Sequence, residues 1–262
     1  MLGPLYTVTT MVIGIDVFES LEGGRFMGFA ASLDSAHAEY FSNSCPLEGE
    51  SVDDWRKCLS VKLQVAFRDA LLHFARRNDK LLPEHIIVYR ASVNPEDWPV
   101  VRATEIAAFQ AVLEQTKNRV FDQDEPKEYQ PHLCFIAIAK RGGMRFFNPS
   151  PDTKNIKNPE PGTVVDSPFA CRVDLPNFFL ISQAVQKGTA IPTHYTVLHN
   201  SKNLTMDVIQ NLTYRLTYMY FNFTGAVRMP APAQYAKKIA NFVGTALRAE
   251  PHPRLQCTLF YL

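Results

Sequence analysis

A change in the spacing of apolar residues near residue 50 constrains the fold of this chain more than any other feature. Before it, three short apolar segments over residues 11–17, 26–33 and 39–42 have the length and composition of β-strands. After it, apolar side chains over residues 59–74 recur at helical spacing, and Asp53 or Asp54 can cap that helix. Three strands followed by a helix predict a strand meander that opens an α/β domain.

Strand-like and helix-like segments alternate along the rest of the chain. A helix is expected over residues 104–115 with Thr104 as its cap, and the apolar segment 255–262 is expected to dock as a terminal strand. Further strands are expected at 86–90, 132–139, 146–147, 162–166, 177–182 and 194–199. Two closing helices are expected, with apolar faces that contain Ile209, Leu212, Leu216 and Met219, then Tyr235, Ile239, Phe242, Val243 and Ala246.

The length of the chain and the order of these segments favour one α/β domain. The chain has 262 residues, of which 46% are hydrophobic, and this is enough for one large core. Three strands followed by strand–helix alternation fit an RNase H-like mixed sheet with flanking helices. Asp16 at the end of the first strand sharpens this prediction, because that fold places its metal-binding acids at neighbouring strand ends.

Cysteine usage and hydropathy bear on the compartment. Five cysteines, an odd number with no C-x-x-C spacing, indicate reduced thiols and no zinc site. No apolar run reaches the ~18–20 residues of a membrane span, and the first residues lack the basic start of a signal peptide. We therefore expect the cytoplasm or another reducing intracellular compartment, and no membrane partner.

Charge is distributed unevenly along the chain. Residues 1–60 contain nine acidic and three basic residues, whereas residues 172–262 contain nine basic and three acidic residues. A basic C-terminal third suits a surface that faces phosphate, and a solvated basic face explains it equally well.

Several stretches together carry a resemblance to a known family. They are VIGIDV (12–17), LQVAFRDAL (63–71), IIVYR (86–90), NPEPGTVVD (158–166), FFLISQAVQKGTAIPTHYTVL (178–198), LTYRLTYMYFNFTGAVRMPAPAQYAKKIANFVG (212–244) and LFYL (259–262). The chain resembles the PIWI domain of Argonaute proteins, most closely the Piwi branch. The resemblance implies a PIWI domain over 11–262, and a linker from a preceding MID-like region over 1–10. It also implies a domain that holds a short guide RNA paired to its target RNA.

Active members of that family cut the target with two metal ions held by four side chains. The resemblance assigns the first position to Asp16 and the second to Asp54, with Glu50 and Asp53 nearby. The third position, an aspartate after Y-R in the family, is Ala91, and the fourth, a His or Asp, is Lys237.

These two replacements predict a catalytically inactive domain. Two Mg²⁺ ions need carboxylate oxygens as ligands, and Ala91 offers none. The protonated Lys237 has only donors, so it would repel a divalent ion and would pair with Asp16. We expect no metal cofactor, and Mg²⁺ at Asp16 only if residual binding survives. His194 and Asp166 are weaker candidates for a displaced ligand, because a structural role explains each of them.

Binding of RNA remains possible without cutting. The candidate contacts with the RNA backbone are Lys187, Arg215, Arg228, Lys238 and Arg248, with the basic loop over 140–160 as a second surface. The resemblance also implies that the terminal carboxylate of Leu262 lies near the pocket for the 5′-phosphate of the guide. The expected partners are guide and target RNA, and MID- and PAZ-type domains in the same or another chain.

Two other interpretations remain open. One is a structural or assembly module with a PIWI fold and no bound RNA. The other is an active nuclease with rearranged ligands such as Asp16, Asp54 and Asp166.

Overall fold

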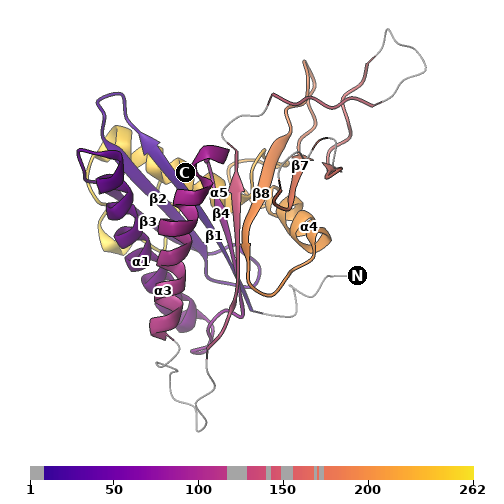
Figure 1. Cartoon of the computed structure of the whole chain (residues 1–262). Coiled ribbons are helices and arrows are strands. Elements are labelled where there is room, and N and C mark those ends of the chain that lie inside the picture. The colour runs from indigo at the N-terminus through magenta and orange to yellow at the C-terminus, as the bar shows by residue number, and fades with distance from the viewer. Residues whose placement is uncertain (1–8, 117–128, 140–142, 149–155, 168–169, 171–173) are drawn as a thin grey trace.

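A mixed sheet forms the centre of the molecule (Figure 1). The computed structural model describes residues 9–116, 129–139, 143–148, 156–167, 170 and 174–262. Within these residues eight strands lie in the order β3-β2-β1-β4-β5-β8-β7-β6. The β1–β4 and β4–β5 pairs are parallel, and the other neighbours are antiparallel. The strands are β1 Thr10–Glu19, β2 Arg25–Ser32, β3 Tyr40–Leu47, β4 His85–Arg90, β5 His132–Ile138, β6 Thr163–Val165, β7 Asn177–Ile181 and β8 Thr193–Asn200.

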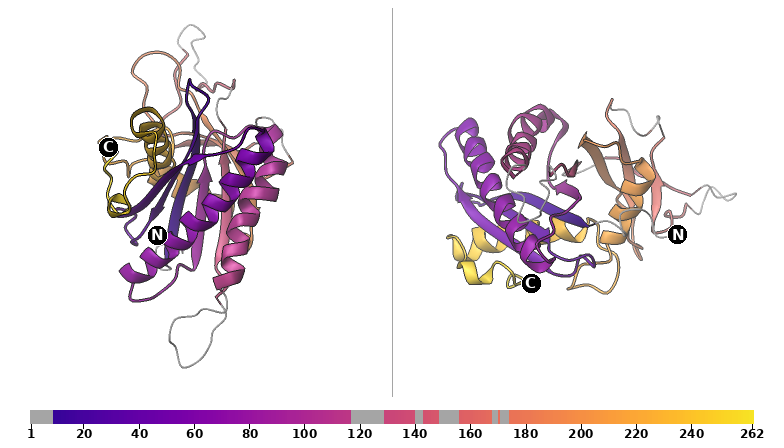
Figure 2. Two further views of the ribbon diagram at one scale, coloured as in Figure 1. Left: turned by 90° about the vertical axis from the view of Figure 1, so that its left-hand side faces the viewer. Right: turned by 90° about the horizontal axis from the view of Figure 1, so that it is seen from below.

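Helices cover both faces of this sheet, as the view from below in Figure 2 shows. The helices are α1 Val52–Arg77, α2 Trp98–Val101, α3 Ala107–Thr116, α4 Met206–Leu216 and α5 Ala231–Phe242. Apolar side chains of α1 and α3 form one core with the sheet, whereas those of α4 and α5 form two clusters on the opposite face. The predicted mixed sheet with flanking helices is confirmed.

Two glycines allow α5 to lie unusually close to the sheet. A Cβ atom on Gly14 of β1 would lie 1.9 Å from Pro232 O, and one on Gly28 of β2 would lie 2.0 Å from Ala236 O. Neither distance is possible for a real side chain, so only glycine fits at these two positions. The close approach fixes where the exposed face of α5 stands relative to the end of β1.

The helix starts differ from those expected. Ser51 caps α1, and Asp54, the third residue of the helix, completes a capping box in which its carboxylate accepts from Ser51. The helical run after β4 begins at Pro95–Asp97 and continues through a π-helical turn at Arg102–Ile106. Thr104 therefore lies inside this run and is no cap, since its Oγ1 donates to Val100 O at 2.8 Å.

The segment 255–262 docks on the protein, but not as a strand. It begins at the last residue of a 3₁₀ turn, Pro253–Leu255, and continues in hydrogen-bonded turns. The N–H of Ser42 on β3 donates to Gln256 O at 2.6 Å, and the Ser42 hydroxyl lies 2.8 Å from the buried Tyr261 hydroxyl. The segment thus covers the outer edge of β3. Pro251 and Pro253, just before it, cannot donate to a strand ladder, and from Leu259 on apolar residues no longer alternate with polar ones.

Two smaller predictions were also wrong. Phe146 and Phe147 form no strand; their neighbour Asn148 makes only an isolated bridge to Lys157. Met219 follows α4, which ends at Leu216. Residues 1–8, which hold most of the predicted linker, lie outside the described part. Among the described residues, no helix combines the length and apolar character that crossing a membrane demands.

Candidate functional site

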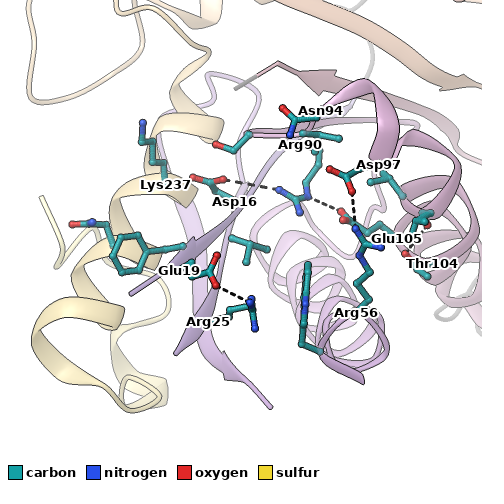
Figure 3. A pocket seen from close by; sticks show the side chains of 18 of the residues that line it. Asp16, Glu19, Arg25, Arg56, Arg90, Asn94, Asp97, Thr104, Glu105 and Lys237 are labelled. Atoms are coloured by element: carbon teal, nitrogen blue, oxygen red, sulfur yellow. Dashed lines mark hydrogen bonds and ion pairs between the residues drawn. The ribbon is translucent and has the colours of Figure 1, made fainter. Parts of the chain in front are cut away.

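A cavity of about 690 Å³ opens at the carboxyl ends of β1 and β4 (Figure 3). Its walls come from these strand ends, the start of α1, the helical run after β4, and α5. The polar residues that line it are Asp16, Glu19, Arg25, Arg56, Arg90, Ser92, Asn94, Asp97, Thr104, Glu105, Gln234, Lys237, Lys238 and Asn241. Two of the four positions in the predicted nuclease set, Asp16 and Lys237, therefore line one cavity.

Ala91 lies beside Asp16 at the end of the parallel strand pair. Ile15 pairs with Arg90, and the N–H of Ala91 continues the ladder by donating to Ile15 O at 2.8 Å. Ala91 is fully buried and packs in the apolar cluster with Tyr89 and Ala233. The residue that follows β4 beside Asp16 therefore carries a methyl group and no carboxylate.

The guanidinium of Arg90 occupies the space between two buried acids, as Figure 3 shows. Its Nε lies 2.8 Å from Glu105 Oε2, and its Nη1 lies 4.0 Å from Asp16 Oδ1. The Nη1 also donates to Ala91 O at 2.6 Å. Glu105 is the acid that our sequence analysis missed, although one signal was present. It interrupts an apolar stripe at helical spacing, formed by Val101, Glu105, Ala108, Phe109 and Val112.

The Asp16 carboxyl is held in an unfavourable environment for a charge. Burial raises its pKa, against the opposing effects of the nearby Arg90 charge and of hydrogen bonds from Ser92 and the backbone of Val17. Its Oδ1 is buried and has no hydrogen-bond partner among the described residues. The expected pair between Asp16 and Lys237 is replaced by the pair with Arg90, and Lys237 has only the weakest influence on Asp16.

Two further ion pairs close the rim of the cavity. Arg25 Nη2 lies 2.6 Å from Glu19 Oε1, and Arg56 Nη2 lies 2.6 Å from Asp97 Oδ1. The two guanidinium groups lie 5.4 and 5.5 Å from the ring of Trp55. Each of the four acids in the lining thus has an arginine partner. The acids are outnumbered by the bases Arg25, Arg56, Arg90, Lys237 and Lys238, so the lining does not fit a pair of divalent cations.

The other proposed metal ligands do not line this cavity. Asp54 is exposed and hydrogen-bonds to the helix cap Ser51 at the start of α1. Asp166 accepts from Gln210 Nε2 of α4 at 2.9 Å. His194 Nε2 lies 2.9 Å from Asn177 Oδ1, and its ring stacks on Phe179. All three have structural partners, and no group of three or more metal-binding side chains occurs among the described residues.

The predicted contacts with RNA are spread over several elements. Lys238 lines the cavity beside Lys237 on α5, whereas Lys187 is exposed on the turn before Gly188. Arg248 forms an ion pair with Glu22 at 2.7 Å. The remaining candidates are a half-buried Arg215 in α4, an exposed Arg228 and a half-buried Leu262 beside the α5 cluster. Lys140, Arg141 and Lys154 of the basic loop lie outside the described residues.

A mixed sheet with an aspartate at the end of its first strand, next to a parallel strand end and under a closing helix, defines an RNase H-like protein. The family model for the Piwi domain matches residues 3–248. The chain belongs to the Piwi domain family, as its resemblance to Argonaute proteins predicted.

Curated relatives and solved structures agree with this assignment. The chain is 36% identical over 257 residues to Piwi-like protein 1 of Gallus gallus, covering 96% of this chain and 27% of that protein. It is 33% identical over 267 residues to Protein argonaute-3 of Drosophila melanogaster, covering 99% of this chain and 28% of that protein. The chain thus spans about a quarter of the length of these relatives.

Two solved structures share the fold. The crystal structure of Drosophila Piwi superposes with a TM-score of 0.77 at 28% identity, covering 97% of this chain and 32% of that one. The structure of Kluyveromyces polysporus Argonaute with a guide RNA has a TM-score of 0.81 at 20% identity, covering 99% of this chain and 31% of that one. The predicted RNase H-like fold is therefore confirmed.

Proposed function

We propose that this protein binds a short guide RNA paired with its target RNA, in RNA silencing, and does not cut the target. Membership of the Piwi family supports the RNA-binding part, and the related yeast Argonaute was solved with a guide RNA. The composition of the cavity carries the second part. Ala91 and Lys237 stand where the resemblance places metal ligands of the family, and neither side chain supplies a carboxylate.

The loss of cutting follows from electrostatics. Two Mg²⁺ ions must be neutralised and bridged by carboxylates while they stabilise the attacking and leaving oxygens. In this cavity every acid has an arginine partner, and with two further lysines the bases outnumber the acids five to four. Loss of one member of a cooperating catalytic set commonly costs about 10⁴-fold or more in rate, and here two are replaced.

The wider setting of the protein belongs to the same proposal. MID- and PAZ-type domains, in the same or another chain, would supply the remaining contacts with the guide RNA. A reducing intracellular compartment such as the cytoplasm fits cysteines that are free at positions 45, 58, 134 and 257.

One surface favours an assembly module as the second candidate. Tyr218, Phe221 and Phe223, between α4 and α5, are exposed by 49%, 62% and 53%. Grouped exposed aromatic side chains suit a protein interface. In that case the fold would serve as a docking platform without RNA.

Purification of the longest native form from its own cells separates these candidates. Nucleic acid extracted from it is end-labelled and sized on a gel. A discrete band of short RNA with 5′-phosphates is expected, and no RNA or a smear without a preferred length would favour the assembly module. The same preparation is given labelled target with Mg²⁺ or Mn²⁺. Guided cleavage that disappears in Asp16→Ala would disprove the proposed inactivity.

A further inference from the structure

One wall of the cavity is a stripe of hydrogen-bond donors on α5. Gln234, Lys237, Lys238 and Asn241 are spaced three, four and seven residues from the first, so they share one face of the helix, and all four line the cavity. Lys237, Lys238 and Asn241 are exposed. This wall contains no carboxylate, so it offers positive charge and neutral amides, whose N–H groups can donate.

On the opposite walls, arginines already pair with each of the four acids. Glu19 and Asp97 pair with Arg25 and Arg56 at 2.6 Å each, and Arg90 lies between Asp16 and Glu105. Among the ion pairs of the described residues, none involves Lys237 or Lys238. The five bases of the lining exceed its four acids by one positive charge, and the two ammonium groups are the cations without an ion-pair partner in the described part of the chain. An anion is the ligand that would balance this excess.

The size and chemistry of the cavity indicate which anion. A volume of about 690 Å³ lies within the range of ordinary ligand sites, so it accommodates a backbone phosphate with its riboses. Asn94 adds an amide from the wall opposite α5, and its side chain makes no helix-capping hydrogen bond. Lysine and amide donors are the usual partners of nucleic-acid phosphates.

We propose that this cavity binds a phosphodiester of the guide–target duplex, with Lys237 and Lys238 as its counter-ions in place of metal. Asn241 and Asn94 donate to the same backbone from the two walls. This inference rests on the proposed function and deepens it, since the remnant of the nuclease site becomes an RNA-binding site that needs no metal. No bond is made or broken.

The test measures binding of a 5′-phosphorylated, fluorescently labelled RNA duplex in EDTA at several salt concentrations. The variant Lys237→Gln/Lys238→Gln is compared with Lys237→Arg/Lys238→Arg, which keeps both charges. Lys80→Gln is a matched control, because Lys80 is exposed and precedes β4, at the opposite end of the sheet. We expect the glutamine variant to bind roughly 10-fold more weakly, and its salt slope to fall by about 1 to 2. The arginine variant and the control should match the unsubstituted protein.

A scan with neutral methylphosphonate linkages locates the phosphate. Single linkages are replaced along the guide strand in one series and along the target strand in another. At one position, the neutral linkage should weaken RNA binding by the unsubstituted protein and leave binding by the glutamine variant unchanged. The series in which this position occurs identifies the strand.

The possible failures are distinguishable. If the unsubstituted protein binds the duplex, but the glutamine variant has the same salt slope and the same scan, the inference is wrong and the proposed function stands. Binding that requires Mg²⁺ also overturns the inference alone. If the unsubstituted protein binds no RNA duplex, both fail.

Discussion

Arg90 Nε lies 2.8 Å from Glu105 Oε2, and both side chains are buried, with 7% and 4% of their surface exposed. This pair joins the end of β4 to the π-helical turn at Arg102–Ile106. Its position sets the orientation of the guanidinium that also faces Asp16, so the pair organises the floor of the cavity.

The substitution Glu105→Gln should therefore destabilise the protein by about 3–5 kcal/mol, because it leaves Arg90 without its closest carboxylate in a buried site. Urea unfolding at pH 7 measures the change. Glu39→Gln removes the partner of Arg77 in an exposed pair and should leave the unfolding midpoint nearly unchanged. Equal effects of the two substitutions would show that the buried pair contributes no more than an exposed one.

Neutralising Asp16 should not destabilise the protein, in contrast to neutralising Glu105. Because burial raises its pKa, the native state binds a proton more readily than the unfolded state, and stability from this group falls as pH rises from about 3.8 through the raised pKa. Asp16→Asn should thus be no less stable than the unsubstituted protein at pH 7, and it should lose this part of the pH dependence. Unfolding series at pH 4 to 7 test both statements. A large loss of stability at pH 7 would mean that the charged carboxylate stabilises the fold.

A histidine pair at the other end of the parallel strands predicts sensitivity to acid. His85 Nδ1 lies 3.0 Å from His132 Nδ1, and His132 Nε2 lies 2.8 Å from Asn200 Oδ1. Burial lowers the pKa of both rings, and nearby Lys202 adds to this effect. The native state therefore binds fewer protons, and stability is lost as pH falls below about 6.5.

The variant His85→Gln should flatten this loss, because one of the two titrating rings is removed. Thermal unfolding midpoints between pH 7.5 and 5 measure the slope for both proteins. His252→Gln serves as the control, because His252 is exposed and its Nδ1 accepts only a local hydrogen bond, from Arg254 N, within the described residues. The prediction fails if the slopes of the His85 and His252 variants are the same.

Gly28→Ala should displace α5 from the sheet. The added Cβ would lie 2.0 Å from Ala236 O and 2.8 Å from Ala240 Cβ, so the helix must move. Overpacking of this kind costs about 1–3 kcal/mol or more, and the moved Lys237 and Lys238 should bind RNA more weakly. Gly143→Ala meets nothing within 4 Å and should change neither property. Unfolding and duplex binding of the two variants provide the comparison.

Restoring two ligands should restore an interaction with metal. The double variant Ala91→Asp/Lys237→His returns a carboxylate beside Asp16 and removes the ammonium group. We expect Mg²⁺ to raise its thermal midpoint, with no such rise in the unsubstituted protein or after a further Asp16→Asn substitution. A midpoint insensitive to Mg²⁺ in the double variant would show that the arginine pairs alone exclude the ion.

The sheet was largely predictable because its strands are short apolar runs, and each expected strand from 11–17 to 194–199 is present apart from the one at 146–147. Helix starts were less predictable, since several polar residues near a start can each cap it. Ser51 was selected over Asp53 and Asp54 by the geometry of the capping box.

The cavity was only partly predictable. The positions of Asp16 and Lys237 follow from the family motifs, but the role of Arg90 depends on a carboxylate 15 residues away, supplied by a π-helical turn. No periodicity at the level of sequence specifies where such a turn falls. For the same reason, the sequence does not determine whether Arg90 or Lys237 is the ion-pair partner of Asp16.

The hydrogen bonds from Ser42 to Gln256 and Tyr261 have a consequence for biogenesis. Ser42 and Tyr261 are 219 residues apart in sequence. During synthesis the outer edge of β3 therefore stays open until almost all of these residues have left the ribosome, and an open strand edge is prone to pair with other chains. Substitutions at Tyr261 would then reduce the yield of folded protein through aggregation of nascent chains.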